Sequence, residues 1–196
     1  MNTALDSVRE AITVVRAGGI IIFPTDTAYG IGCRVDNPGS VDRLFTVRRR
    51  PRTQATPVLV DSIDMALAYF DEPLAIVRHL MKTYWPGALT IIAPSKTNLI
   101  YSPICGGGKN VGIRMPDHQT ILEIIRGSRV PVLGPSANFH GDPTPYSMAD
   151  VNPQLIKLVD YVVPGTCRGN QASTVVDCSV KPYKIIRQGS VVISPL

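Results

Sequence analysis

The apolar positions along the chain predict a succession of short helices and strands. Residues 5–16 carry apolar side chains at helical spacing and precede Gly18 and Gly19, a pair typical of the end of a helix. Residues 20–23 form a continuous apolar run, which is typical of a strand buried on both faces. The same criteria predict further helices over residues 40–50, 63–69, 74–84, 119–127 and about 147–158, and further strands over residues 57–60, 88–93, 111–115, 131–133, 161–163, 174–178 and 184–187.

Strands and helices interleave throughout the chain, so the pattern predicts an α/β fold built on one mixed sheet. No internal repeat and no shift in composition marks a domain boundary, and we expect residues 1–196 to form a single domain. No apolar run approaches the roughly 18 residues of a membrane span. Asp6, Arg9 and Glu10 lie where a signal peptide would need an apolar stretch. We therefore expect a cytoplasmic protein that does not engage a membrane.

The composition supports a globular protein with a modest excess of positive charge. Hydrophobic residues make up 44% of the chain and charged residues 18%, which excludes an acidic or basic disordered tail. The 20 Lys and Arg residues outnumber 15 Asp and Glu, giving a net charge of +5. This excess fits an anionic ligand better than a nucleic-acid wrapper, without deciding between them. The four cysteines form no CxxC pair and the three histidines are scattered, so no metal-ligand spacing is present.

A polar segment follows the first predicted strand. Its sequence, residues 24–32, is PTDTAYGIG, which brings hydroxyl groups and backbone amides to the carboxyl edge of a sheet. Ligands of open α/β sheets bind at such edges. The alternative is an ordinary turn in which Thr25 or Asp26 caps the next element.

A cluster of four arginines, Arg48, Arg49, Arg50 and Arg52, follows at the end of the second predicted helix. Such a cluster is often a solvated helix end that complements the helix dipole. It also has the chemistry for phosphate capture, since guanidinium groups bind phosphate oxygens in pairs. The sequence leaves both interpretations open.

Three later positions are further candidates. Ser136 and Asn138, two residues apart in an extended segment, can face one ligand, although turn chemistry is the commoner role. Arg114 interrupts an apolar strand and must have a partner, either a ligand carboxylate or an internal Asp or Glu. The glycine run 106–108 lacks the spacing of a phosphate loop and fits a loop that closes over a ligand. His140 lacks the sequence context of a catalytic base.

The order of these motifs resembles the YrdC-like family, the L-threonylcarbamoyladenylate synthases. The resemblance extends over residues 18–187 and rests on the segments PTDTAYGIG, RRRP, YWPGALT, VGIRMP, GPSAN, STVVD and IIRQGS. It implies a twisted open mixed sheet flanked by helices around a large positively charged cavity. Longer members of the family carry an additional C-terminal domain, and this chain resembles the short, single-domain form.

The resemblance also implies a reaction. L-threonine, bicarbonate and ATP would give threonylcarbamoyl-AMP and diphosphate, and the product would supply threonylcarbamoyladenosine in tRNA through downstream transferase proteins. A carbamate formed from threonine needs no protein nucleophile, which accounts for the missing acid–base pair. Two alternatives stay open: a non-catalytic RNA-binding module of the same fold, and a relative that performs another carbamoyl transfer.

The residue roles implied by the resemblance fall on numbered positions of this chain. The Lys-x-Arg and Ser-x-Asn hallmark of the family falls on Arg48-x-Arg50 and Ser136-x-Asn138. Arg48 and Arg50 would be catalytic, with Mg²⁺ bound through the ATP phosphates. Threonine contacts would fall on Thr27, Arg114, Ser136 and Ser173, and ATP contacts on Arg50, Asn110, Asn138, Tyr146 and Arg187.

The chain departs from the family pattern in three places. Arg48 stands where Lys is usual, which keeps the charge and changes the geometry. The loop over residues 51–57 is about two residues longer than the common RPxxxP. Asp61 stands where many members have His, at a position to which the resemblance assigns a threonine-side contact.

Overall fold

The computed structural model describes residues 3–96 and 98–194 and has the interleaved α/β order expected from the sequence. Most predicted elements are present within one or two residues of their expected bounds. In chain order the elements are α1 (Thr3–Arg16), β1 (Ile21–Phe23), β2 (Gly30–Gly32), α2 (Pro38–Val47), β3 (Val58–Leu59), α3 (Ile63–Tyr69), α4 (Ala75–Tyr84), β4 (Leu89–Pro94), η1 (Ser102–Cys105), β5 (Asn110–Arg114), α5 (Gln119–Ser128), β6 (Val132–Leu133), η2 (Met148–Asp150), α6 (Pro153–Ile156), β7 (Tyr161–Val162), β8 (Thr174–Asp177) and β9 (Lys184–Arg187).

The strands form two hydrogen-bonded sheets rather than one, and we refer to them as the smaller and the larger ladder. The smaller has the order β2-β1-β7 and the larger the order β6-β3-β5-β4-β8-β9, and both mix parallel with antiparallel pairs. Main-chain hydrogen bonds join them where β2 meets the β6 segment, from Ile31 to Pro135 at 2.9 Å and from Leu133 to Cys33 at 2.9 Å. The expected single mixed sheet is therefore wrong: the strands form two mixed sheets, linked by isolated main-chain hydrogen bonds.

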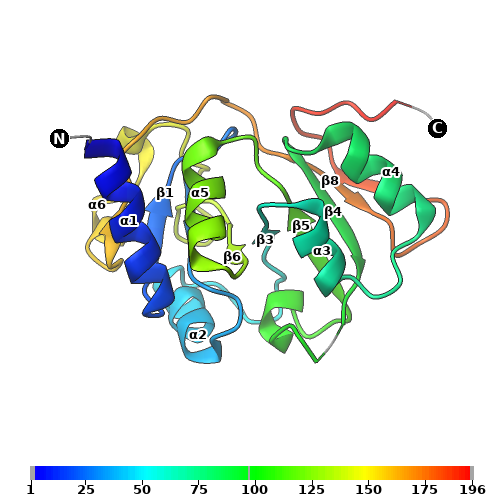
Figure 1. Ribbon diagram of the computed structural model, residues 1–196, viewed down its shortest axis with the longest axis horizontal. Coiled ribbons are helices and arrows are strands. Elements are labelled where there is room, and N and C mark those ends of the chain that lie inside the picture. The colour runs from blue at the N-terminus through cyan, green and yellow to red at the C-terminus, as the bar shows by residue number, and fades with distance from the viewer. Residues whose placement is uncertain (1–2, 97, 195–196) are drawn as a thin grey trace.

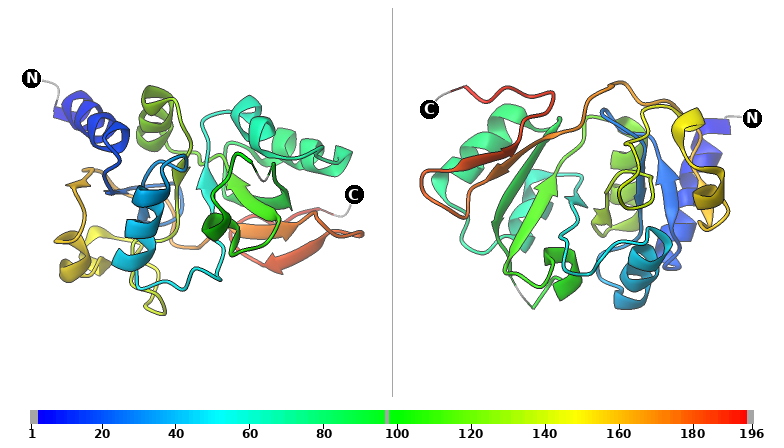
Figure 2. Two further views of the ribbon diagram at one scale, coloured as in Figure 1. Left: turned by 90° about the horizontal axis from the view of Figure 1, so that it is seen from below. Right: turned by 180° about the vertical axis from the view of Figure 1, so that it is seen from behind.

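Four helices cover one side of the strands. Figure 1 shows α1 beside α5 at one end of the molecule and α3 beside α4 at the other. The view from below in Figure 2 places these four on the same side, with α2 and α6 on the opposite side. This arrangement gives each ladder a covered face.

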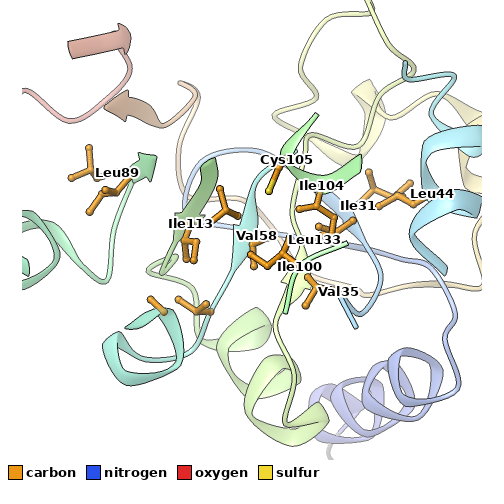
Figure 3. Close-up of a cluster of buried hydrophobic side chains, with 14 of the residues drawn as sticks. Ile31, Val35, Leu44, Val58, Leu89, Ile100, Ile104, Cys105, Ile113 and Leu133 are labelled. Atoms are coloured by element: carbon orange, nitrogen blue, oxygen red, sulfur yellow. The ribbon is translucent and has the colours of Figure 1, made fainter. Parts of the chain in front are cut away.

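The core continues from one ladder to the other. Alternate residues of β1 enter different clusters, because Ile22 packs with the large core while Ile21 and Phe23 pack against α1 and α5. Figure 3 shows Val58 and Leu133, from neighbouring strands of the larger ladder, in one cluster with other buried side chains. The prediction that residues 20–23 are buried on both faces is confirmed.

Three expectations about elements need correction. Strand β2 was not predicted, because a Gly-Ile-Gly segment has no alternating pattern. The helix expected over residues 40–50 is α2, which ends at Val47, because Arg49 adopts the left-handed conformation with φ of 54°. The helix expected at about 147–158 is two short turns, η2 and α6, separated by an extended Val151.

Two further observations concern the whole chain. None of the helices in the described residues is both long and apolar enough to cross a membrane. The four cysteines are free thiols.

Candidate functional site

The candidate site is a cavity at the junction of the two ladders. Its first compartment has a volume of about 180 Å³ and includes side chains from the β1–β2 loop, the turn after α2, β4, β5 and the segments around Ser136 and Ser173. A second compartment of about 400 Å³ adjoins it. Residues shared by both are Arg50, Pro57, Thr90, Ser173 and Arg187. The two compartments therefore form one continuous binding region.

The loop after β1 is a tight turn built by Thr25. Its Oγ1 accepts hydrogen bonds from the main-chain nitrogens of Thr27 and Ala28 at 3.1 and 3.2 Å and donates to the Ala28 oxygen at 2.7 Å. The turn interpretation of this segment is therefore confirmed, with Thr25 as the capping residue. The turn is capped by Thr25, and it presents Thr27 to the first compartment.

Arg114 has an internal carboxylate partner. Its Nη2 donates to Asp26 Oδ1 at 2.5 Å, Nη1 donates to Thr27 Oγ1 at 2.8 Å, and Nε donates to the Gly87 oxygen at 3.0 Å. The side chain is 6% exposed, and burial lowers its pKa while the adjacent Asp26 opposes that shift. Each terminal nitrogen of Arg114 keeps one further N–H. Because Arg114 lines the cavity, these groups can also bind a ligand carboxylate.

Arg48 and Arg50 enter the cavity from the turn that ends α2. Arg48 is 3% exposed and Arg50 is half-buried, and both line the first compartment. Arg50 is held by the main-chain oxygens of Gln54 and Ala55, at 3.2 and 2.6 Å. Burial lowers the pKa of Arg50 and, together with the charge of Arg50, lowers that of Arg48 to about 10. Two positive charges therefore face the same small space.

The other two arginines of the cluster point elsewhere. Arg49 lies over the ring of Phe139, with 4.1 Å between the guanidinium carbon and the ring centroid. Arg52 forms an exposed ion pair with Asp42 at 3.0 Å. Of the four arginines, only Arg48 and Arg50 therefore line the cavity.

Arg187 reaches the cavity from β9 and is fixed by Ser173. Its Nη2 donates to Ser173 Oγ and its Nε to the Ser173 main-chain oxygen, both at 3.0 Å. Ser173 Oγ also contacts Thr90 Oγ1 at 3.0 Å. None of the ion pairs among the described residues involves Arg48, Arg50 or Arg187, so the cavity holds three guanidinium groups without a carboxylate partner.

The Ser-x-Asn pair lies against Arg48. Ser136 lines the first compartment, and its Oγ donates to Asn138 Oδ1 at 2.7 Å. Asn138 and Tyr146 do not line either compartment. Both border a neighbouring hollow of about 640 Å³ that shares Thr144 with the first compartment. Of the residues assigned to ATP by resemblance, the structure brings together Arg50, Asn110 and Arg187 in the second compartment.

The glycine run borders the second compartment. Gly106 and Gly107 have φ of 63° and 81°, the left-handed region that favours glycine. A Cβ on Gly106 would lie 2.8 Å from the Ala55 nitrogen, so the run packs closely on the segment that holds Arg50. Gly108 and Asn110 line the compartment.

Two candidate positions lie outside the cavity wall. Asp61 accepts a hydrogen bond from Ser62 and lies 3.8 Å from Arg126, so in place of a threonine-side contact it takes part in an ion pair. His140 is exposed, and its main-chain nitrogen donates to the Arg48 oxygen at 2.8 Å.

Several wall residues were not identified from the sequence. Thr90 and Thr56 are wall residues without a local sequence signal. Asp26 does not line either compartment, and the partner of Arg114 that it provides was foreseen only as an unspecified acid. The Oγ1 of Thr56 is buried without a hydrogen-bond partner. Only an alignment of motif order could have indicated Thr90, which ends the YWPGALT segment.

Comparison with known proteins identifies the family. The family model Sua5_yciO_yrdC, described as telomere recombination, matches residues 13–189. The chain belongs to the Sua5/YciO/YrdC family. This confirms the resemblance and the fold inferred from the motif order.

Named relatives and a solved structure agree with this assignment. A threonylcarbamoyl-AMP synthase of Bacillus subtilis (strain 168) is 31% identical over 97% of this chain, which spans 56% of that protein. One of Pseudoalteromonas translucida (strain TAC 125) is 29% identical over 87% of this chain and 92% of its own length. The crystal structure of P. abyssi Sua5 complexed with L-threonine superposes with a TM-score of 0.88 at 31% identity, covering 93% of this chain and 54% of that one. This chain thus spans about half the length of the B. subtilis and P. abyssi proteins.

Proposed function

We propose that this protein is a threonylcarbamoyl-AMP synthase that joins L-threonine, bicarbonate and ATP. One observation carries the proposal: three guanidinium groups without carboxylate partners converge on a two-compartment cavity. Relatives bearing that name support it. Triphosphate is the anion whose charge matches several guanidinium groups.

The two compartments suit the two larger substrates. The smaller compartment, with Thr27, Arg114, Ser136 and Ser173, offers hydroxyl groups and a guanidinium to an amino acid. The second compartment offers apolar walls from Ile92 and Val175 and a polar Asn110, which suit a nucleoside. The shared residues Arg50 and Arg187 lie where the triphosphate would bridge the two.

The reaction requires alignment and charge more than acid–base chemistry. The threonine amine and bicarbonate form a carbamate with loss of water. A carbamate oxygen then bonds to the α-phosphorus of ATP, and diphosphate leaves with the electron pair of the broken P–O bond. Arg48, Arg50 and Arg187 stabilise the negative charge that spreads over the phosphates during this displacement.

Magnesium would enter with the nucleotide. Among the described residues, no three His, Cys, Asp or Glu side chains lie close enough together to hold a metal ion. The cavity wall is instead cationic, which fits an ion held by substrate phosphates, as Mg²⁺ commonly is. Its chemistry there would be charge neutralisation on the polyphosphate.

The product would be consumed by transferases that modify tRNA. Direct tRNA binding by this protein is part of the same proposal. The alternative to the synthase function is an RNA-binding module without catalysis. The alternative predicts salt-dependent RNA binding with no ATP turnover.

The test is formation of the adenylate. Incubation with ATP, Mg²⁺, bicarbonate and L-threonine should release diphosphate and form threonylcarbamoyl-AMP, detected by mass spectrometry, and omission of any one substrate should stop both. Arg50→Ala should lower the rate by at least a hundredfold, because it removes a charge-assisted contact to phosphate.

Arg52→Ala is the matched control. It removes an arginine of the same cluster that pairs with Asp42 on the surface, and it should retain the full rate. Adenylate formation that is unaffected by Arg50→Ala, or that does not require threonine, would contradict the proposal.

A further inference from the structure

Asn138 accepts two hydrogen bonds from one edge of the Arg48 guanidinium group. Its side-chain Oδ1 accepts a hydrogen bond from Arg48 Nη2 at 3.0 Å, and its main-chain oxygen accepts one from Arg48 Nε at 3.2 Å. Two donors of the same planar group therefore meet two acceptors of one residue. Such a paired arrangement fixes the plane of the guanidinium as well as its position.

The side chain of Asn138 is itself fully engaged at its oxygen. Oδ1 accepts a second hydrogen bond from Ser136 Oγ at 2.7 Å, and Nδ2 donates to the main-chain oxygen of Asp142 at 2.5 Å. Because an amide oxygen has two lone pairs, Oδ1 has no acceptor capacity left for a ligand. Oδ1 must face the donors of Arg48 and Ser136 while Nδ2 faces the Asp142 oxygen, so the amide of Asn138 has only one possible orientation.

The remaining nitrogen of Arg48 has no partner. Nη1 is buried and makes no hydrogen bond to any residue that the structure describes, although Arg48 lines the first compartment. A buried N–H group without an acceptor is costly, and a buried cation without a counter-ion is more so. The arrangement is therefore incomplete until an anion reaches Nη1.

We propose that Asn138 is a positioning residue, which holds Arg48 so that Nη1 faces an anionic ligand in the cavity. The inference rests on the proposed function only in naming that anion as a polyphosphate. It differs from the role given by resemblance, in which Asn138 contacts ATP directly.

We call the paired hydrogen bonds from Arg48 to Asn138 the clamp. The clamp is needed because residue 48 is an arginine. The ammonium group of lysine, usual at this position, is a compact charge with rotating donors and needs no orientation. The guanidinium fork directs its donors within one plane, so rotation of the group would change the direction in which Nη1 points. Ser136, by binding Asn138 Oδ1, holds the clamp in turn.

A double-mutant cycle on pyrophosphate affinity tests the proposal. Calorimetry with inorganic pyrophosphate would compare the unaltered protein, Asn138→Ala, Arg48→Met and the double variant. We expect Asn138→Ala to weaken affinity about tenfold and Arg48→Met more, with the double variant no weaker than Arg48→Met. A further tenfold loss in the double variant would mean that Asn138 contacts the ligand itself, which overturns the proposal.

Hydrogen exchange at the Arg48 guanidinium, followed by NMR, tests the clamp without any ligand. Exchange should be at least tenfold faster in Asn138→Ala. Asn138→Asp keeps the two acceptors of Arg48 but loses the donor to the Asp142 oxygen, and its negative charge should weaken pyrophosphate binding. Unchanged exchange in a folded Asn138→Ala protein would overturn the proposal.

His140→Ala is the control, because His140 is an exposed neighbour in the same loop that does not line the cavity. It should leave affinity and exchange unchanged. A protein that forms no threonine-dependent adenylate but shows the non-additive cycle would refute the proposed function and leave the clamp in place. Thermal unfolding of each variant identifies any that fails to fold.

Discussion

Arg48 is held inside the protein as a cation without a carboxylate partner. Burial and the neighbouring Arg50 lower its pKa to about 10, so the guanidinium stays charged at neutral pH. The folded-state pKa lies below that of the unfolded chain, and the free energy of unfolding is therefore reduced at every pH below about 10. An anion in the cavity relieves this penalty.

We expect pyrophosphate to raise the melting temperature of the protein at pH 7 to 8, because it binds the folded state alone. The increase should fall as the pH rises through about 10, where Arg48 loses its proton. Differential scanning fluorimetry across that range measures both effects. Arg48→Met should greatly reduce the pyrophosphate-induced increase without preventing folding, and an equal increase in that variant would contradict the role assigned to Arg48.

The contacts of Arg114 show how far residue-level prediction reached. An arginine within an apolar strand indicates a partner, and the sequence allowed either a ligand or an internal acid. The acid is Asp26, which lies 88 positions earlier in the chain. Nothing local distinguishes Asp26 from other carboxylates, because their pairing depends on how β1 and β5 are placed in space.

At the scale of elements, helix α2 delivers Arg48 and Arg50 to the cavity. Its first turn is capped by Asn37, whose side chain accepts a hydrogen bond from the Ser40 nitrogen at 3.1 Å. We expect Asn37→Ala to lower the free energy of unfolding by about 1 kcal/mol in urea denaturation, because the cap is lost.

Asn37→Asp is the corresponding control, since its carboxylate can accept the same hydrogen bond at the positive end of the helix. It should retain the stability of the unaltered protein. Equal losses in the two variants would show that Asn37 stabilises the helix in another way.

The elements that the sequence predicted well are those with a strong apolar period. Helix α3 has the expected bounds, and β1 is buried on both faces. Strand β2 was missed because it has one apolar residue between two glycines and is defined by the strands that it joins. The end of α2 was missed because the left-handed turn at Arg49 carries no glycine signal.

At the scale of the molecule, Gly32 allows the two ladders to meet. A Cβ at this position would lie 1.8 Å from the main-chain oxygen of Leu133, so any side chain would force the backbones apart. We expect Gly32→Ala to lower the free energy of unfolding by about 3 kcal/mol in urea denaturation.

Gly39→Ala provides the comparison, because the nearest atom to a Cβ there is 3.4 Å away and the position is helical. It should be neutral or stabilising by up to about 1 kcal/mol. A Gly32→Ala protein as stable as this control would show that the junction is loose.

The position of the cavity residues along the chain determines the order in which the cavity wall is synthesised. Its wall begins with Thr25 and is completed by Arg187, so it draws on both ladders and on nearly the full span of the chain. During synthesis, the β1–β2 loop and the turn after α2 leave the ribosome long before β9. The nascent chain therefore acquires Arg48 and Arg50 early and Arg187 last, and the cavity wall is complete only when β9 has joined β8.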